Sequence, residues 1–139
     1  LKNNRDYAVT PVYRIKNAKE IKDNNVVKVV RDFHGNALYF SRSPIPYVRD
    51  LKFENWSNKI PYWAHFGIYG YKRKILLSFN KLQHSYLESA EKLEQLQLLQ
   101  NGLKIFTFET KFYGIHIESP SDIRRVEEYL NRDESDNSY

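Results

Sequence analysis

The sequence contains no cysteine and no methionine, and it has only 5 glycines and 5 prolines among 139 residues. Without cysteine the chain forms no disulfide, offers no thiolate to zinc and has no thiol nucleophile, which suits a reducing cytoplasm. It also lacks an apolar run of the length that crosses a membrane. We expect no signal peptide ahead of Leu1. Because the chain begins at leucine and contains no methionine, we expect it to be part of a longer translation product.

What remains is an ordinary composition for a soluble globular chain, with 41% apolar and 28% charged residues. This length allows one domain at most. The net charge of +5 suits a partner with phosphates or carboxylates, but the basic and acidic residues are interspersed, so a solvated surface explains it equally well. The eleven tyrosines are spread through predicted strands, and no RNA-binding motif or single basic face emerges. We therefore expect no nucleic-acid partner.

Two short stretches carry both strand-forming and polar residues: 37–46 (ALYFSRSPIP) and 65–71 (HFGIYGY). Aromatic and β-branched residues crowd them and neither is long enough for a typical helix, so both are predicted to be strands. Because side chains alternate along a strand, His65 and Tyr69 are expected to point the same way. Arg42 closes the first strand at a proline-rich exit. The alternative is that Tyr69 is a core residue with a satisfied hydroxyl and Arg42 a surface charge.

The other elements follow from periodicity and turn signals. Strands are predicted at 7–15, 26–31, 104–110 and 112–118, with Pro11 indicating an edge or a bend in the first of them. Residues 26–42 are predicted to form a hairpin through a turn at 32–36. The remaining predictions are a helical turn within 17–25, an irregular loop at 49–62, a short helix within 72–82, a helix at 119–130 and a disordered tail at 131–139.

A longer helix is predicted from Ser85, which forms a capping box with Glu88, to the residue before Gly102. On a continuous helix Glu94 would lie on the apolar stripe formed by Leu87, Ala90 and Leu98. A carboxylate buried in this way must be paired, hydrogen-bonded or open to a ligand pocket. A structural partner, such as Arg42, His65 or a backbone amide, and a ligand both remain possible on this ground.

Three runs together resemble one family: NALYFSRSPIPY at 36–47, HFGIYGYK at 65–72 and EKLEQLQLL at 91–99. They resemble the CMP-Kdo synthetases, the 3-deoxy-manno-octulosonate (Kdo) cytidylyltransferases of lipopolysaccharide biosynthesis, with matching order and spacing over about 7–130. The family's basic nucleotide loop and its Gly-Asp-Glu-Pro or Gly-Asp-Asp-Pro turn are absent from this sequence. The resemblance therefore implies the C-terminal half, or slightly more, of an α/β fold. That fold is the three-layer α/β/α nucleotide-diphospho-sugar transferase fold with a mixed sheet, here lacking its N-terminal nucleotide-binding half.

The resemblance also implies an activity and a site. The full-length enzyme would be a cytoplasmic homodimer that converts CTP and Kdo to CMP-Kdo and pyrophosphate with Mg²⁺, and the loop at 49–62 could serve the dimer interface. Catalysis would rest on positioning and electrostatics, with no covalent nucleophile. The residues implied to hold the sugar are Arg42, His65, Tyr69, Glu94 and Gln95. Arg42 suits the sugar carboxylate, while Tyr69, Glu94 and Gln95 suit hydroxyls. This chain alone is expected to be inactive.

The metal site is implied by the segment Ile117 to Ile123, which aligns with the family's Val-Asp-Thr-Pro-Glu-Asp-Leu. Glu118 stands where the family's aspartate binds magnesium, and it keeps an oxygen donor on a side chain longer by one methylene. His116 replaces a position that is usually small. These departures keep a cytidylyltransferase for a related sugar acid open. A non-catalytic truncated paralogue acting as an interaction module is the other alternative.

Overall fold

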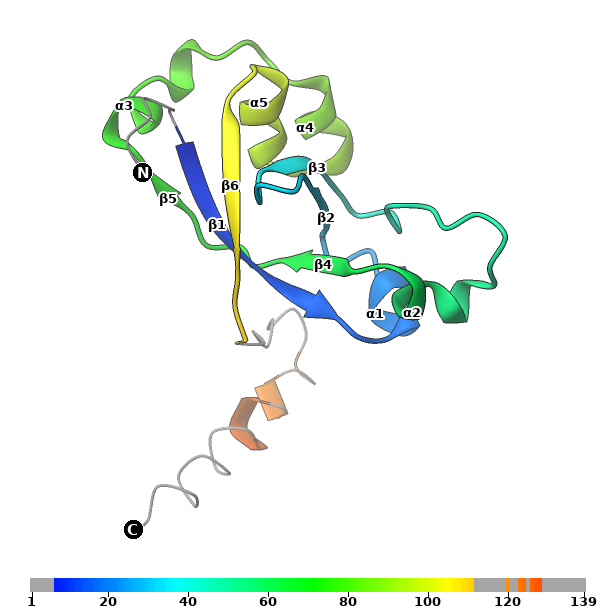
Figure 1. The fold of residues 1–139 in the computed structure, drawn as a ribbon. Coiled ribbons are helices and arrows are strands. Elements are labelled where there is room, and N and C mark those ends of the chain that lie inside the picture. Colours follow the sequence, from blue (N-terminus) through cyan, green and yellow to red (C-terminus); the bar gives the residue numbers. More distant parts are fainter. Residues whose placement is uncertain (1–6, 112–119, 121–122, 125, 129–139) are drawn as a thin grey trace.

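The computed structural model describes residues 7–111, 120, 123, 124 and 126–128. Within them, six strands form one mixed sheet, as the predicted fold class requires (Figure 1). The strands are β1 (Tyr7–Ile15), β2 (Lys28–Arg31), β3 (Ala37–Ser41), β4 (Tyr62–His65), β5 (Gly70–Tyr71) and β6 (Lys104–Glu109). The helices are α1 (Ala18–Lys22), α2 (Trp56–Lys59), α3 (Arg73–Leu76), α4 (Tyr86–Glu91) and α5 (Gln95–Gln100), with 3₁₀ turns at Phe53–Asn55 and Phe79–Lys81. No helix in these described ranges is long and apolar enough to span a bilayer.

The sheet is organised around β1, which pairs antiparallel with β4 and β5 and parallel with β6. Val12 is paired with both His65 and Glu109, and Val9 is paired with both Gly70 and Phe106. Since a strand has only two edges, β4 and β5 lie along one edge of β1 and β6 along the other. The antiparallel pair β2 and β3 extends the sheet beyond β4, and this confirms the predicted hairpin.

The prediction of one strand over 65–71 is wrong, because the chain leaves the ladder between β4 and β5. Five steps separate His65 from Gly70, whereas three separate their partners Val12 and Val9, so this side carries two extra residues. The cause lies on β1. The fully buried hydroxyl of Thr10 is 3.1 Å from the carbonyl oxygen of Phe66 and 2.7 Å from that of Ile68, and it takes the place of a backbone donor.

Pro11 was expected to mark an edge or a bend, but it lies in a central strand. Its carbonyl accepts a hydrogen bond from the backbone N–H of Phe66 at 3.0 Å, so the missing N–H of the proline faces the same neighbouring segment. That segment bulges there, and the Phe66 carbonyl is already contacted by Thr10. The bulge therefore removes the backbone acceptor that a regular ladder would have offered at Pro11.

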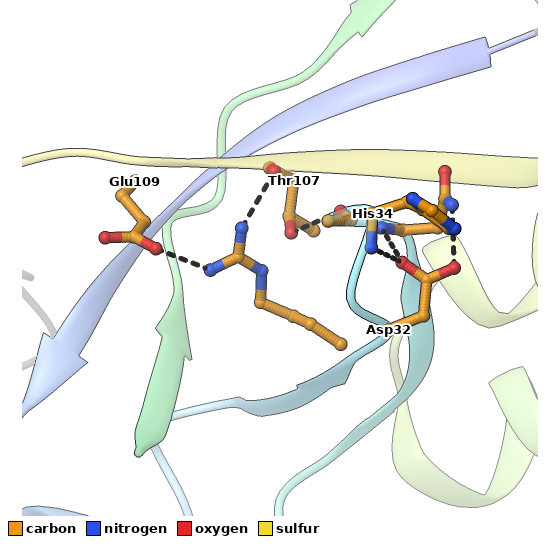
Figure 2. A network of polar contacts seen from close by, with 7 residues as sticks. Asp32, His34, Thr107 and Glu109 are labelled. Atoms are coloured by element: carbon orange, nitrogen blue, oxygen red, sulfur yellow. Dashed lines mark hydrogen bonds and ion pairs between the residues drawn. The ribbon is translucent and has the colours of Figure 1, made fainter.

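The hairpin turn at 32–36 is closed by Asp32 and docked onto β6. The Asp32 carboxylate accepts from the side-chain amide of Asn36 and from the backbone N–H of Asn36 and of His34, each at 2.8 Å (Figure 2). The bond from the Asn36 side chain is the main cause that lowers the pKa of Asp32, and the two backbone bonds lower it further. Gly35 takes a left-handed conformation with φ of 83°. The Thr107 backbone N–H then donates to the Gly35 carbonyl at 2.7 Å.

Arg31 reinforces this docking. Its Nη2 donates to the Thr107 carbonyl at 3.1 Å and its Nη1 pairs with Glu109 at 3.2 Å, contacts that Figure 2 draws beside the turn. The guanidinium also lies over the ring of Trp63, 4.7 Å from its centroid. These bonds hold the β2–β3 hairpin against β6, with which it shares no extended ladder.

The predicted long helix after Ser85 is in fact two short helices. Ser85 caps α4 as expected, since its hydroxyl accepts from the Glu88 N–H at 2.9 Å. The helix stops at Lys92, which takes the left-handed conformation with φ of 55°. The break turns Leu93 and Leu96 into the core, where they are 6% and 0% exposed. The single apolar stripe predicted to contain Glu94 therefore does not exist.

The remaining predictions are mostly confirmed. Strands occur near 7–15, 26–31 and 104–110, the turn within 17–25 is α1, and the 72–82 segment forms α3 and a 3₁₀ turn. The loop at 49–62 contains a 3₁₀ turn and α2, which bury Trp56 beside Tyr62. In Figure 1, α4 and α5 lie at the opposite end of the sheet from α1 and α2. The predicted strand at 112–118 and the tail at 131–139 fall outside the described residues, and only part of the predicted 119–130 helix is described, where it is helical.

Candidate functional site

Arg42 follows the last residue of β3 and is held from several directions. Its Nε donates to the Glu91 carbonyl at 2.9 Å and its Nη1 to the Asn24 carbonyl at 3.1 Å. The side chain is half-buried, and its Nη2 makes no hydrogen bond to the described residues. A guanidinium has five N–H donors, so an oriented part of this one is left for an anion.

His65 ends β4 and is only 8% exposed. Its Nε2 lies 3.0 Å from the Thr10 hydroxyl, and its ring meets the Phe40 ring edge-on at 5.2 Å. The single hydroxyl proton of Thr10 is close to two carbonyl oxygens, which accept only, so we assign the proton of this contact to the imidazole Nε2. Thr10 thus helps to orient the His65 ring.

Arg42 and His65 face a common hollow at the ends of their strands. Its volume is about 180 Å³. The residues that line it are Tyr13, Asn25, Val26, Val27, Arg42, His65 and Gly67. This is smaller than the roughly 300–1,000 Å³ of a typical ligand pocket. The hollow therefore suits one end of a ligand rather than the whole of it.

Tyr69 lies beside His65, with their ring centroids 5.1 Å apart, and it stacks on Tyr71 at 5.6 Å. Burial raises the pKa of the Tyr69 phenol well above its ordinary value, and the nearby Tyr71 and Glu94 raise it further. The phenol is therefore neutral at physiological pH and can both donate and accept. The Tyr69 hydroxyl makes no hydrogen bond to the described residues. The alternative of a core tyrosine with a satisfied hydroxyl therefore does not describe Tyr69 within these residues.

Glu94 is exposed, so its predicted place on a buried apolar face is wrong. It immediately precedes α5 and makes no capping bond to that helix. Its charge nevertheless acts on both Tyr69 and Tyr71, whose pKa values are raised first by burial and also by this carboxylate. Glu94 thus lies within electrostatic reach of the two phenols.

Gln95, the first residue of α5, carries the most unusual polar group. It is 4% exposed, and its amide Nε2 is buried without a hydrogen-bond partner in the described part of the chain. Buried polar atoms are almost always paired, because an unpaired donor costs about 1–3 kcal/mol. The Gln95 amide is therefore a donor that the described residues leave unsatisfied, as they also leave Arg31 Nε.

The predicted metal residue Glu118, like His116, lies outside the described residues. Within the described ranges, no three His, Asp or Glu side chains gather as a metal site. The assignment of Glu118 to magnesium stays a prediction.

Three residues with structural bearing on this site were not predicted: Thr10, Lys28 and Glu91. Lys28 is fully buried, and its signal in the sequence is a charge with two valines on either side in the run VVKVVR. Glu91 stands three residues before Glu94 in the EKLEQ run and contacts the end of β3. Thr10 gives no comparable signal, since its role depends on a segment 55 residues away.

The mixed sheet and its flanking helices define an α/β domain, and comparison with known proteins gives its class. Residues 1–105 match the family model described as Cytidylyltransferase, and the chain belongs to this family.

The similar proteins narrow the class further. The 3-deoxy-manno-octulosonate cytidylyltransferase of Geotalea daltonii is 48% identical over 122 residues, which cover 84% of this chain and 48% of that protein. The enzyme of the same name from Solibacter usitatus is 46% identical over 113 residues, covering 81% and 43%. A solved structure of CMP:2-keto-3-deoxy-manno-octonic acid synthetase complexed with CTP has a TM-score of 0.82 at 36% identity, covering 94% of this chain and 51% of that one. The chain thus spans about half the length of these relatives.

Proposed function

We propose that this chain is the sugar-binding part of a 3-deoxy-manno-octulosonate cytidylyltransferase, which joins CMP from CTP to Kdo and releases pyrophosphate. The names of the similar enzymes and the CTP bound to the similar structure support the reaction. The observation that carries the assignment of this site is the buried amide of Gln95, which has no hydrogen-bond partner among the described residues and directly follows Glu94, whose carboxylate acts on Tyr69.

Each side chain has a role that fits its surroundings. The unused donors of Arg42 bind the sugar carboxylate, which is the only anionic group of Kdo. The neutral phenol of Tyr69, the amide of Gln95 and the carboxylate of Glu94 bind hydroxyls, since together they offer both donors and acceptors. His65, oriented by Thr10, adds one more hydrogen-bonding group at the hollow.

These residues contribute to catalysis by positioning. The sugar must present its anomeric hydroxyl in line behind the α-phosphorus of CTP, and holding it there removes a large entropic part of the barrier. Mg²⁺, when bound, neutralises charge on the triphosphate and on the leaving pyrophosphate. We propose Glu118 as one of its oxygen ligands. The cytosine site and the other metal carboxylate would belong to the part of the relatives that this chain does not cover.

The proposal includes a cytoplasmic homodimer. The loop at 49–62 would contribute to the interface, because Tyr47 and Leu51, near its start, are 76% and 41% exposed. Apolar side chains that are open to water in this way are candidates for contact with a second copy.

The sugar site is tested by replacing Gln95 with leucine in the full-length protein. Leucine has a similar size and removes the unpaired donor, so the melting temperature should stay the same or rise. The KM for Kdo should rise by about tenfold or more, which corresponds to one lost hydrogen bond in a buried site, while the KM for CTP should not change. Gln97→Leu, on the same helix, is the control. A lower melting temperature with unchanged kinetics would mean that Gln95 serves the fold and not the sugar.

A further inference from the structure

The main chain of Arg42 is held by two charged side chains. Arg42 follows the end of β3, where regular pairing stops. Its backbone N–H donates to Glu91 Oε2 at 2.9 Å, and its carbonyl accepts from the Lys28 ammonium at 2.6 Å. The other Glu91 oxygen accepts from the Ser41 hydroxyl at 2.5 Å. Where the ladder of β3 ends, two side chains of opposite charge therefore satisfy the backbone N–H and carbonyl of Arg42.

Lys28 is 0% exposed and uses all three protons of its ammonium on backbone carbonyls. Besides Arg42, the acceptors are Asp23 at 2.7 Å and Val26 at 2.6 Å, which flank Asn24. The Asn24 carbonyl in turn accepts from Arg42 Nη1 at 3.1 Å. Lys28 thus fixes both the backbone of Arg42 and the turn that receives its guanidinium.

Lys28 remains charged at neutral pH although its burial disfavours the charged form. Burial lowers the pKa of Lys28 to about 8, and the nearby Asp23 and Glu91 oppose this fall while Arg42 adds to it. The ammonium is therefore protonated at neutral pH and can donate all three bonds at once.

Glu91 connects Arg42 to the other half of the site. It is the last residue of α4, and its backbone carbonyl accepts from Arg42 Nε at 2.9 Å. The left-handed residue Lys92 follows, and then Glu94 and Gln95 at the start of α5. Glu91 therefore accepts hydrogen bonds from both the backbone N–H and the guanidinium of Arg42. It does so at the end of α4, just before the left-handed residue that leads to Gln95.

We infer that Lys28 and Glu91 are positioning residues that set the Arg42 guanidinium at a fixed place relative to Gln95. The inference rests on the proposed function, because it gives Arg42 the sugar carboxylate. Burying the Lys28 ammonium costs more desolvation free energy than an apolar residue of similar size would, and the half-buried Glu91 carboxylate also loses part of its hydration. Stability alone does not require them, whereas a displacement of the guanidinium by about 1 Å can cost a hundredfold in rate.

The test uses the full-length protein with Glu91→Gln and Lys28→Met. Glutamine keeps the size of Glu91 but replaces one acceptor oxygen with a donor, so this variant is expected to fold. Both variants should raise the KM for Kdo by about tenfold, with less than about twofold change in the KM for CTP. Glu88→Gln on α4 and Lys19→Met on α1 are the matched controls and should change neither constant.

A double-mutant cycle separates positioning from general stability. If Glu91 acts through Arg42, then Glu91→Gln should add little to the KM for Kdo once Arg42→Ala is present. Additive effects, or equal rises in both KM values, would overturn this inference while leaving the proposed function intact. A wild-type enzyme that makes no CMP-Kdo would instead overturn the proposed function.

Discussion

Thr10→Val is the most informative single change, because it removes one buried hydroxyl and keeps the shape of the side chain. The hydroxyl donates to a carbonyl of the 66–69 bulge and accepts from His65 Nε2 at 3.0 Å. Valine would remove the hydrogen bonds that the hydroxyl makes with a carbonyl oxygen and with the His65 imidazole. At about 1–1.5 kcal/mol for each lost bond, the free energy of unfolding should fall by about 2–3 kcal/mol.

The assay is urea unfolding of the 139-residue chain followed by tryptophan fluorescence, together with thermal melting. For a chain of this size the loss corresponds to a fall in melting temperature of roughly 6–12 °C. Thr10→Ser is the control, since it keeps the hydroxyl and removes only one methyl group, at a cost of about 1 kcal/mol. Equal losses in the two variants, or a valine variant as stable as the wild type, would refute the role given to the hydroxyl.

The remaining predictions concern the ligands. Glu94→Ala in the full-length protein should raise the KM for Kdo by about tenfold, as expected for a lost hydrogen bond to a charged group, and should leave CTP binding nearly unchanged; equal loss of both, measured in steady-state kinetics, would contradict a sugar role. The 139-residue chain alone should release no pyrophosphate from CTP and Kdo in a coupled assay, since it spans about half the length of its relatives. Robust turnover by this chain would show that the nucleotide site is already contained in it.

Much of the fold could be predicted because its signals are local. The β-branched run at 26–31 and the turn formers at 32–36 specify the β2–β3 hairpin within a few residues of each other. The Ser85 cap and its Glu88 partner are likewise neighbours on the chain, and both predictions are confirmed.

The errors occur where a distant contact decides the local structure. The run HFGIYGY alternates like a single strand, but the Thr10 hydroxyl accommodates a bulge within it. The sequence EKLEQL consists of good helix formers, yet Lys92 turns left-handed because the break buries Leu93 and Leu96. Glu94 was misplaced for this reason, since its predicted position required an unbroken helix.

The candidate site shows the same division. Of the residues that the family resemblance implied, Arg42 and His65 line one hollow. Tyr69, Glu94 and Gln95 are not among its lining residues, so the joint sugar site stays a prediction. The sequence alone could not show that the Gln95 amide is unpaired, because this depends on the packing of several separate segments. The same is true of the hydrogen bonds from Lys28 and Glu91 to the Arg42 backbone.

The central place of β1 has a consequence for how the domain assembles. Its parallel neighbour β6 begins at Lys104, so almost ninety residues must be synthesised after Ile15 before this edge can close. Pairing over such a long loop carries a large entropic penalty and is slow. During translation, β1 would therefore stay exposed along one side until β6 has left the ribosome, and in this interval the nascent chain is most open to chaperones and to aggregation.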